Sequence, residues 1–414
     1  MQSARIHYDL RVPRPLSRLT PGLLAALGFT AAVSPLATDM YLASFRSVQE
    51  DLQASASSVQ LTLSLFFLGL GAGQLILGTL SDNLGRRRVL LASLSVFTVA
   101  GVTMVFTPSI EVLNSLRLVQ GFSGAAGIVI ARAIAADLSE GETAVRALSI
   151  IAMVSGLGPL IAPPIGGITH ELFGWRGTLA TLALVSILML LIAWLKIPES
   201  LPPEKRGSTQ LRSTFAPFGK FVRNPRYMAY LLTFVFGFAA MIAYISASPF
   251  VGQTLLGMSS LEYSLGFALS ASALVLATLV NSRVAPIVGP RRMLSVGLAL
   301  LVAGSASMLA LTLTGTLGVW VFIACAFVLS GGSGLILSNA SALALAEADF
   351  ARGSGAALLG SLQFTVGGLM APLVGAWGEH TALPMALAVF LTAAVAAVCA
   401  FLGARLGPVA PARN

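Results

Sequence analysis

Two charged side chains lie within stretches of sequence that are otherwise apolar. Asp39 is the only acidic residue well inside such a stretch, and Arg117 lies inside another. A carboxylate held away from water is costly and is a functional residue by default. Because arginine stays protonated, a nearby Arg117 would keep Asp39 ionised until substrate, water or a conformational change alters the balance. We therefore expect Asp39 and Arg117 to couple proton transfer to another process; a static ion pair joining the two segments is the alternative.

The segments around these residues have the length and composition of membrane-spanning helices. Apolar residues make up 56% of the 414 residues and charged residues 10%, against about 25% charged residues in soluble domains. This balance excludes a soluble enzyme, a disordered chain, a coiled coil and a secreted disulfide-rich domain. A membrane-spanning helix needs about 20 apolar residues. We predict twelve such helices, at about 21–45, 57–80, 89–107, 112–136, 143–169, 175–197, 227–252, 262–286, 292–313, 317–345, 353–376 and 382–404.

The twelve predicted helices form two halves. The only long polar stretch, 198–226, separates the sixth helix from the seventh. We therefore predict an N-terminal half at 1–197 and a C-terminal half at 227–414, joined by this cytoplasmic linker. Most Lys and Arg residues then fall in alternate loops, which places the linker and both termini in the cytoplasm. The net charge of +9 is thus a topology signal, and we expect no nucleic-acid partner.

The same topology sets the depths of the buried charges. Asp39 lies about six residues, or ~9 Å, from the outer end of the first helix, and Arg117 lies at a similar depth in the fourth. Arg132 follows further along the fourth helix, ~22 Å closer to the cytoplasm. We interpret Arg132 as a structural arginine whose charged end reaches the membrane interface.

Two short sequence echoes relate the halves. GPLIAPPIGG at 158–167 is echoed by GGLMAPLVGA at 367–376, and LGRRRVL at 84–90 is echoed by VGPRRML at 288–294. Two six-helix repeats around a site near the middle of the membrane are the architecture of secondary transporters.

The loop between the second and third helices combines charges with glycines. It reads Gly78-Thr-Leu-Ser-Asp82-Asn-Leu-Gly85-Arg86. Glycine permits tight turns and close helix contact, and Asp82 and Arg86 are four residues apart, so they can pair. This G-x-L-x-D-x-x-G-R pattern resembles the loop signature of the major facilitator superfamily. The resemblance implies that Asp137 joins Asp82 and Arg86 in a cytoplasmic gate.

Further motifs resemble the drug:proton antiporters of the Bcr/CflA type within that superfamily. DMYL at 39–42 is similar to their first-helix aspartate signature, although Ala43 stands where that family usually has proline. RLVQGFSG at 117–124 resembles their fourth-helix motif, whose arginine is implicated in proton transfer. The segment 158–167 resembles their fifth-helix antiporter motif.

The fifth-helix motif also has a direct physical interpretation. Proline removes helix hydrogen bonds and glycine removes side-chain bulk, so this segment can bend and pack closely. We expect it to prevent proton leakage while the halves move; a plain kink is the alternative. The residues concerned are Gly158, Pro159, Pro163, Gly166 and Gly167.

A substrate cavity needs polar and aromatic side chains that face the middle of the bundle. The second half has no deeply buried charge, which favours an apolar cargo. The candidate lining residues are Met40, Tyr41, Gln120, Tyr230, Phe234, Tyr244, Asn339 and Gln363; helix packing is the alternative role for each.

Together these signals predict a proton-coupled exporter of small amphiphilic, drug-like compounds with an all-α, major facilitator fold. We expect neutral or zwitterionic cargo, protons as the coupling ion, and a monomer in the lipid bilayer of the bacterial inner membrane. A proton-coupled importer of a small nutrient on the same fold is the alternative. The sequence has no ATP-binding motif, no cluster of metal ligands and no candidate catalytic centre. We therefore expect no metal, no organic cofactor and no enzyme activity.

Overall fold

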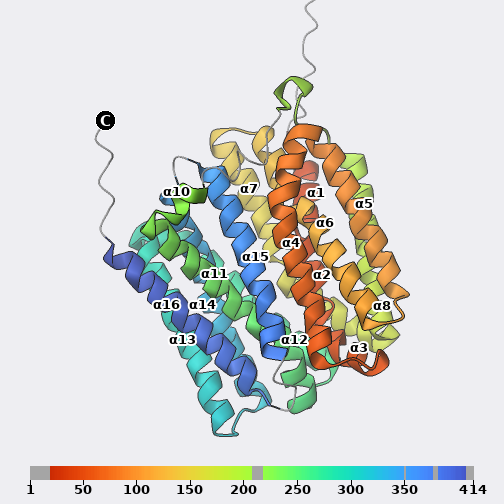
Figure 1. Ribbon diagram of the computed structural model, residues 1–414, viewed down its shortest axis with the longest axis vertical. Coiled ribbons are helices and arrows are strands. Elements are labelled where there is room, and N and C mark those ends of the chain that lie inside the picture. The colour runs from red at the N-terminus through yellow and green to blue at the C-terminus, as the bar shows by residue number, and fades with distance from the viewer. Residues whose placement is uncertain (1–18, 208–217, 349–350, 376–380, 407–414) are drawn as a thin grey trace, which may run out of the picture.

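Helices make up all the regular structure of the described residues. The computed structural model describes residues 19–207, 218–348, 351–375 and 381–406 (Figure 1). By length and apolar composition, ten helices in these ranges can cross a membrane, or eleven if the bent pair Pro21–Ala31 and Val33–Asp51 is one crossing. One of the ten, Gly141–Lys196, has 56 residues, far more than the ~20 that one crossing needs. The all-α class is confirmed, whereas twelve crossings and the orientation of the termini stay predictions.

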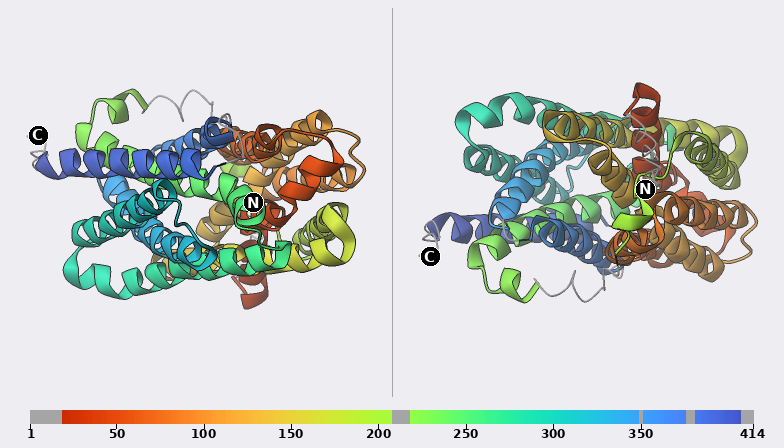
Figure 2. Two further views of the ribbon diagram at one scale, coloured as in Figure 1. Left: turned by 90° about the horizontal axis from the view of Figure 1, so that it is seen from below. Right: turned by 90° about the horizontal axis from the view of Figure 1, so that it is seen from above.

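The helices form two groups in Figure 1, with most of α1 to α8 on one side and most of α10 to α16 on the other, while α7, α12 and α15 lie where the groups meet. Figure 2 shows the same groups from both ends of the bundle. The first group contains α1 (Pro21–Ala31), α2 (Val33–Asp39), η1 (Leu42–Ser44), α3 (Phe45–Asp51), α4 (Ala56–Leu84), α5 (Arg86–Val105), α6 (Ile110–Asp137), α7 (Gly141–Gly156) and α8 (Gly158–Lys196). The short helix η2 (Pro203–Lys205) follows, and the second group contains α10 (Phe218–Val222), α11 (Pro225–Pro249), η3 (Phe250–Leu255), α12 (Ser260–Val288), α13 (Pro290–Leu313), α14 (Val319–Ala346), α15 (Arg352–Gly375) and α16 (Leu383–Arg405).

The first predicted helix is broken into several pieces. α1 ends at Ala31, and α1 and the segment Val33–Asp51 are bent by 41°. Pro35 explains the break, because proline cannot donate a backbone hydrogen bond and its ring clashes with the carbonyl four residues earlier. α2 then ends at Asp39. The break places the aspartate at a helix end instead of inside a continuous helix.

The fifth and sixth predicted helices meet at a glycine. α8 runs from Gly158 to Lys196, but Gly174 inside it has φ of 68°, a conformation outside the helical range. Only glycine adopts this left-handed region without steric cost. The predicted boundary between 169 and 175 therefore coincides with a real break in α8.

The loops before α5 and α13 share one backbone conformation. Gly85 has φ 98° and ψ 145°, and Gly289 has φ 90° and ψ 147°; each precedes the first residue of the next helix. A positive φ at both positions explains why both loops need glycine. The sequence echo between 84–90 and 288–294 thus corresponds to a repeated structure.

The two ends of the bundle differ in the contacts between the two halves. We call the end with residues 85, 137 and 197–206 the linker side, and the opposite end the far side. On the far side, Gln253 Nε2 donates to the Ala43 carbonyl at 3.2 Å and Arg46 Nη1 donates to the Gln253 carbonyl at 3.4 Å. These hydrogen bonds join η3 to η1 and α3. The Arg176 guanidinium also donates to Asp51 there and holds the pKa of this carboxyl below its usual value.

Glycines allow α4 and α6 to pack at very short range. A Cβ on Gly121 of α6 would overlap the Phe66 carbonyl of α4, and a Cβ on Gly69 of α4 would overlap the Leu118 carbonyl of α6. Small residues at such contacts let helix backbones approach closely in a membrane. This contact fixes α6, which carries Arg117, against the rest of the first half.

Gly121→Ala should therefore lower the melting temperature of the purified protein in detergent, because overpacking of a tight contact costs roughly 1–3 kcal/mol. Gly22→Ala is the matched control, since nothing lies within 4 Å of a Cβ at Gly22, and alanine is the better helix former. Equal melting temperatures for Gly121→Ala and wild type would contradict the close α4–α6 contact.

Candidate transport cavity and linker-side charge cluster

A cavity of about 300 Å³ lies between the two halves. Its wall includes Asp39, Gln74 and Arg132 from the first half and Tyr244 and Gln363 from the second. The lining combines a large apolar surface with a few polar groups, as is usual for small-molecule sites. The cavity therefore has the composition expected for an amphiphilic ligand.

Asp39 lies in the wall of this cavity with 5% of its surface exposed. Thr38 Oγ1 donates a hydrogen bond of 2.8 Å to its carboxyl oxygen. No basic side chain among the described residues forms an ion pair with Asp39. The carboxyl is thus buried, weakly partnered and in contact with the space where a ligand would bind.

Arg117 is completely buried and lies at the level of Asp39 without touching it. Its Nη1 donates to the Ala37 carbonyl at 2.9 Å and to Gln120 Oε1 at 3.1 Å. The guanidinium carbon also lies 4.1 Å from the centre of the Tyr41 ring, a favourable cation–π geometry. The hydrogen bond to Ala37 agrees with the predicted common depth, but the described conformation contains no ion pair between Asp39 and Arg117. In this conformation the guanidinium is instead bound by a carbonyl, an amide and a ring.

Aromatic rings from both halves form one wall of the cavity. The Phe67 ring of α4 stacks on the Phe364 ring of α15, with centroids 5.8 Å apart, and Phe238 of α11 contacts Phe364 edge-on at 5.4 Å. Tyr244 and Phe267 form a second stacked pair, 6.1 Å between centroids. All five rings line the cavity. Such a wall favours flat, polarisable ligands.

Two of the eight predicted cavity residues, Tyr244 and Gln363, line the cavity; the other six pack elsewhere. Tyr41 and Gln120 contact Arg117, Asn339 Nδ2 donates to Asn281 Oδ1 at 2.7 Å, and Tyr230 packs beside Gly403. Met40 and Phe234 are buried among apolar neighbours. All six therefore have the alternative role of helix packing, although the Tyr41 and Tyr230 hydroxyls and Gln120 Nε2 are buried without a hydrogen-bond partner among the described residues.

The structure also adds cavity residues that the sequence did not indicate. Arg132 lines the cavity, although its position suggested a side chain at the membrane interface. Gln74, Phe67, Phe238 and Phe364 were indistinguishable in the sequence from ordinary packing residues. Phe67, Phe238 and Phe364 lie on three separate helices, so no short stretch of sequence indicates that their rings come together.

The predicted glycine and proline motif of α8 packs against both halves. A Cβ on Gly158 would lie 2.5 Å from Pro35 Cγ, and one on Gly166 would overlap the Met40 carbonyl. A Cβ on Gly167 would lie 2.6 Å from Ser264 Oγ of α12. Pro163 is buried in α8 and Pro159 lines the cavity. The motif therefore lies where the first helix, α8 and the second half meet.

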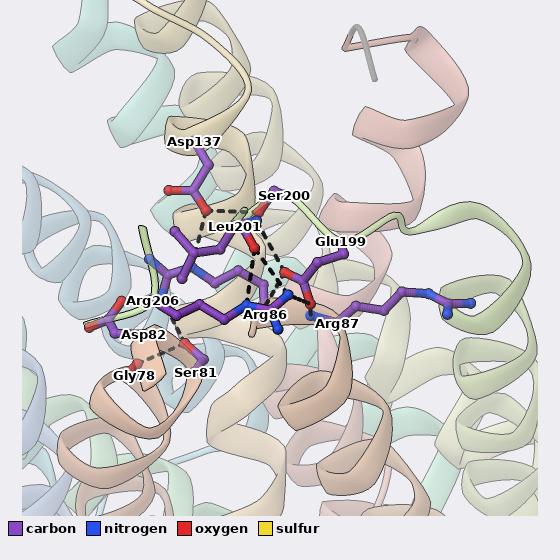
Figure 3. Close-up of polar contacts among 10 residues, drawn as sticks. All are labelled: Gly78, Ser81, Asp82, Arg86, Arg87, Asp137, Glu199, Ser200, Leu201 and Arg206. Carbon is purple, nitrogen blue, oxygen red and sulfur yellow. Dashed lines mark hydrogen bonds and ion pairs between the residues drawn. The ribbon is translucent and has the colours of Figure 1, made fainter. Parts of the chain in front are cut away.

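A charge cluster surrounds the loop between α4 and α5 on the linker side (Figure 3). Arg86 Nη1 contacts Asp82 at 2.5 Å, and Arg86 Nε contacts Asp137 at 3.1 Å. Arg86 Nη1 also donates to Ser81 Oγ at 2.7 Å, and Gly78 accepts a hydrogen bond from Ser81. The three gate residues predicted to associate do lie together, and these partners all belong to the first half.

Glu199, at the start of the linker, completes this cluster. Its carboxylate accepts hydrogen bonds from the backbone N–H groups of Arg86, at 2.9 Å, and Arg87, at 3.3 Å. It therefore caps the N-terminus of α5, where free N–H groups and the helix dipole favour an anion. A Cβ on Gly85 would lie 2.5 Å from Glu199 Oε2, so the turn glycine also makes room for the cap. Ser200 Oγ donates to Asp137 at 2.7 Å, which ties the linker to the same cluster.

Comparisons with known proteins agree with this architecture. A family model described as Major Facilitator Superfamily matches residues 27–372. The chain therefore belongs to the Major Facilitator Superfamily and is a multi-pass transporter of the bacterial inner membrane, not an enzyme.

Its relatives define the group more narrowly. The chain is 31% identical to YdgK of Bacillus subtilis, an uncharacterized MFS-type transporter, over 94% of this chain and 96% of YdgK. It is 31% identical to a bicyclomycin resistance protein homolog of Haemophilus influenzae, over 87% and 91% of the two chains. It is also 29% identical to multidrug resistance protein D of Escherichia coli, over 85% and 88%. These relatives confirm the resemblance to the Bcr/CflA type.

Solved structures confirm the fold. A bacterial homolog of the human lysosomal transporter Spinster, in an inward-facing and occupied conformation, matches 94% of this chain and 98% of its own with a TM-score of 0.72. Their sequence identity is 16%, so this likeness concerns the fold alone.

Glu199→Ala should lower the melting temperature, because loss of a helix N-terminal cap costs about 0.5–2 kcal/mol. Glu204→Ala, which removes an exposed carboxylate from the same linker, is the control and should have little effect. Two variants that melt alike would show that the Glu199 cap contributes no stability.

Proposed function

We propose that the chain exports small amphiphilic, drug-like compounds in exchange for protons by alternating access. The observation that carries this proposal is the buried Asp39 carboxyl in the wall of a cavity between the two halves. Inside a membrane protein, such a group is the expected site for a transported proton. Relatives named for resistance to bicyclomycin, to chloramphenicol and to multiple drugs support a drug-like cargo.

In the predicted orientation the linker side faces the cytoplasm. The cavity then extends towards the cytoplasm, where Arg132 and Ser155 line it, while hydrogen bonds join the halves at the outer side. We assign this conformation to the inward-facing state, in which cargo enters and the proton leaves.

One carboxyl group provides a simple basis for exchange. Asp39 holds either a proton or the polar end of a cargo molecule, so arrival of one favours departure of the other. Arg117 lies at the same depth and disfavours protonation of Asp39 when the two approach. The binding energy of the cargo thereby drives release of the proton into the cytoplasm.

A proton-coupled nutrient importer is the second candidate on this fold. Carriers of sugars or organic anions need several polar groups in both halves, whereas the described second half contributes mainly aromatic and aliphatic side chains to the cavity. This wall favours the exporter.

Expression in a pump-deficient bacterial host, tested on a broad panel of antibiotics and dyes, addresses the overall function. We expect raised resistance to at least one amphiphilic compound, and loss of this resistance when a proton uncoupler is added. Resistance that survives the uncoupler would refute proton coupling, and growth on a limiting nutrient without any resistance would favour the importer.

Asp39→Asn should abolish accumulation of that compound against its gradient in proteoliposomes with an imposed pH gradient, because the amide cannot exchange a proton. Downhill exchange should persist. Glu50→Gln is the matched control, since Glu50 is an exposed carboxylate on the far side. Full pH-driven accumulation by Asp39→Asn would refute the assignment of the proton site.

Asp82→Ala should change the balance between the inward-facing and outward-facing states and slow transport more than it weakens binding, because it removes one partner of Arg86 from the gate. The measurement is the labelling rate of Ser155→Cys, a cavity residue, in a background where Cys325 and Cys399 are serine. Glu140→Ala, at the start of α7, is the control. An unchanged labelling rate would count against a gating role for Asp82.

A further inference from the structure

Arg132 is an unpartnered charge in the cavity wall. Its side chain is exposed to the cavity, and it forms no hydrogen bond or ion pair with any residue in the described ranges. Side chains on an α-helix tilt towards its N-terminus, and α6 starts on the far side and ends at Asp137. The tilt therefore starts the Arg132 side chain away from the linker-side surface, and the side chain lines the cavity.

The residues around Arg132 favour the binding of an anionic group. Asp39 and Arg132 are the only Asp, Glu, His, Lys or Arg residues among the described lining residues. A guanidinium bordered by a largely apolar wall gains most from a planar anion that accepts two hydrogen bonds, such as a carboxylate. Nothing in the described protein provides one, so the ligand is the natural source.

Asp39 and Arg132 line the cavity at different depths along the bundle. Asp39 is at the depth of Arg117, and ~22 Å of helix separates Arg117 from Arg132; the inward tilt of the Arg132 side chain shortens this span. The stacked rings of Phe67 and Phe364 line the same cavity. A compact α-amino acid is too short to reach both charges, whereas an elongated aromatic molecule can reach them.

We propose that the cavity selects elongated aromatic zwitterions, with a carboxylate on Arg132, an ammonium group towards Asp39 and the ring system against Phe67, Phe238 and Phe364. This inference rests on the proposed function and specifies its cargo. The 300 Å³ cavity limits the cargo to about one fused ring system with short substituents. The ammonium group takes the place of the proton at Asp39, so binding and proton release are linked.

Three related fluorescent probes test this selectivity on the purified full-length protein. They are 6-(aminomethyl)-2-naphthoate, a zwitterion; its methyl ester, a cation; and 6-methyl-2-naphthoate, an anion. Fluorescence anisotropy gives the dissociation constant of each. We expect wild type to bind the zwitterion at least about tenfold more tightly than the ester, the size of effect expected for a charge-assisted hydrogen bond.

Variants assign this preference to Arg132. Arg132→Gln should bind the zwitterion and the ester equally, and Arg132→Lys should retain part of the difference. Arg291→Gln, which removes an exposed arginine outside the cavity, should behave as wild type. Asp39→Asn should weaken the zwitterion and the ester but leave the anion unchanged.

Three outcomes would overturn the proposal. Wild type that binds the ester as tightly as the zwitterion, or none of the probes, rejects the selectivity without reference to any variant. An Arg132→Gln protein that keeps the preference rejects the role of Arg132. Because binding requires no proton gradient, loss of selectivity with intact pH-driven export rejects only this inference, whereas selective binding without pH-driven export rejects only proton coupling.

Discussion

The cost of keeping charge away from water governs the arrangement of the first half. Arg117 is fully buried, and the Ala37 carbonyl, Gln120 and the Tyr41 ring surround its guanidinium. To provide these partners, α6 must lie against the broken first helix. The glycine contact between α4 and α6 makes that position possible, and the break near Pro35 turns Asp39 towards the cavity.

Local signals explain what the sequence could predict. A lone acid in an apolar run identified Asp39, and helix geometry placed Arg117 at its depth, as the contact with Ala37 shows. A glycine that needs positive φ marked the turn at Gly85, and four-residue spacing anticipated the contact between Asp82 and Arg86. Each of these features depends on a few adjacent residues or on one helix, so no knowledge of the packing was needed.

Features that depend on the packing of several helices were not predictable. Every helix that borders the cavity is apolar on several faces, so periodicity did not distinguish Phe67, Phe238 or Phe364 from lipid-facing residues. The same ambiguity led to Met40 and Phe234 as candidates, which pack away from the cavity. The role of Glu199 could not be read from the sequence, because its function as a cap requires the N-terminus of α5, more than a hundred residues earlier in the chain.

The repeated fold carries different chemistry in its two halves. Gly85 and Gly289 adopt the same conformation, but proline occupies positions 286 and 290, which correspond to Asp82 and Arg86. On its linker side the second half instead has an ion pair of Arg226 with Glu347, at 3.2 Å between α11 and the end of α14.

The cavity shows the same asymmetry, since both of its described charges come from the first half and four of its five rings come from the second. In the proposed mechanism, the charged surface and the aromatic surface that faces it hold an amphiphile between them. Movement of one half relative to the other then changes the access to the cargo without separating the two charges, because both charges belong to the first half.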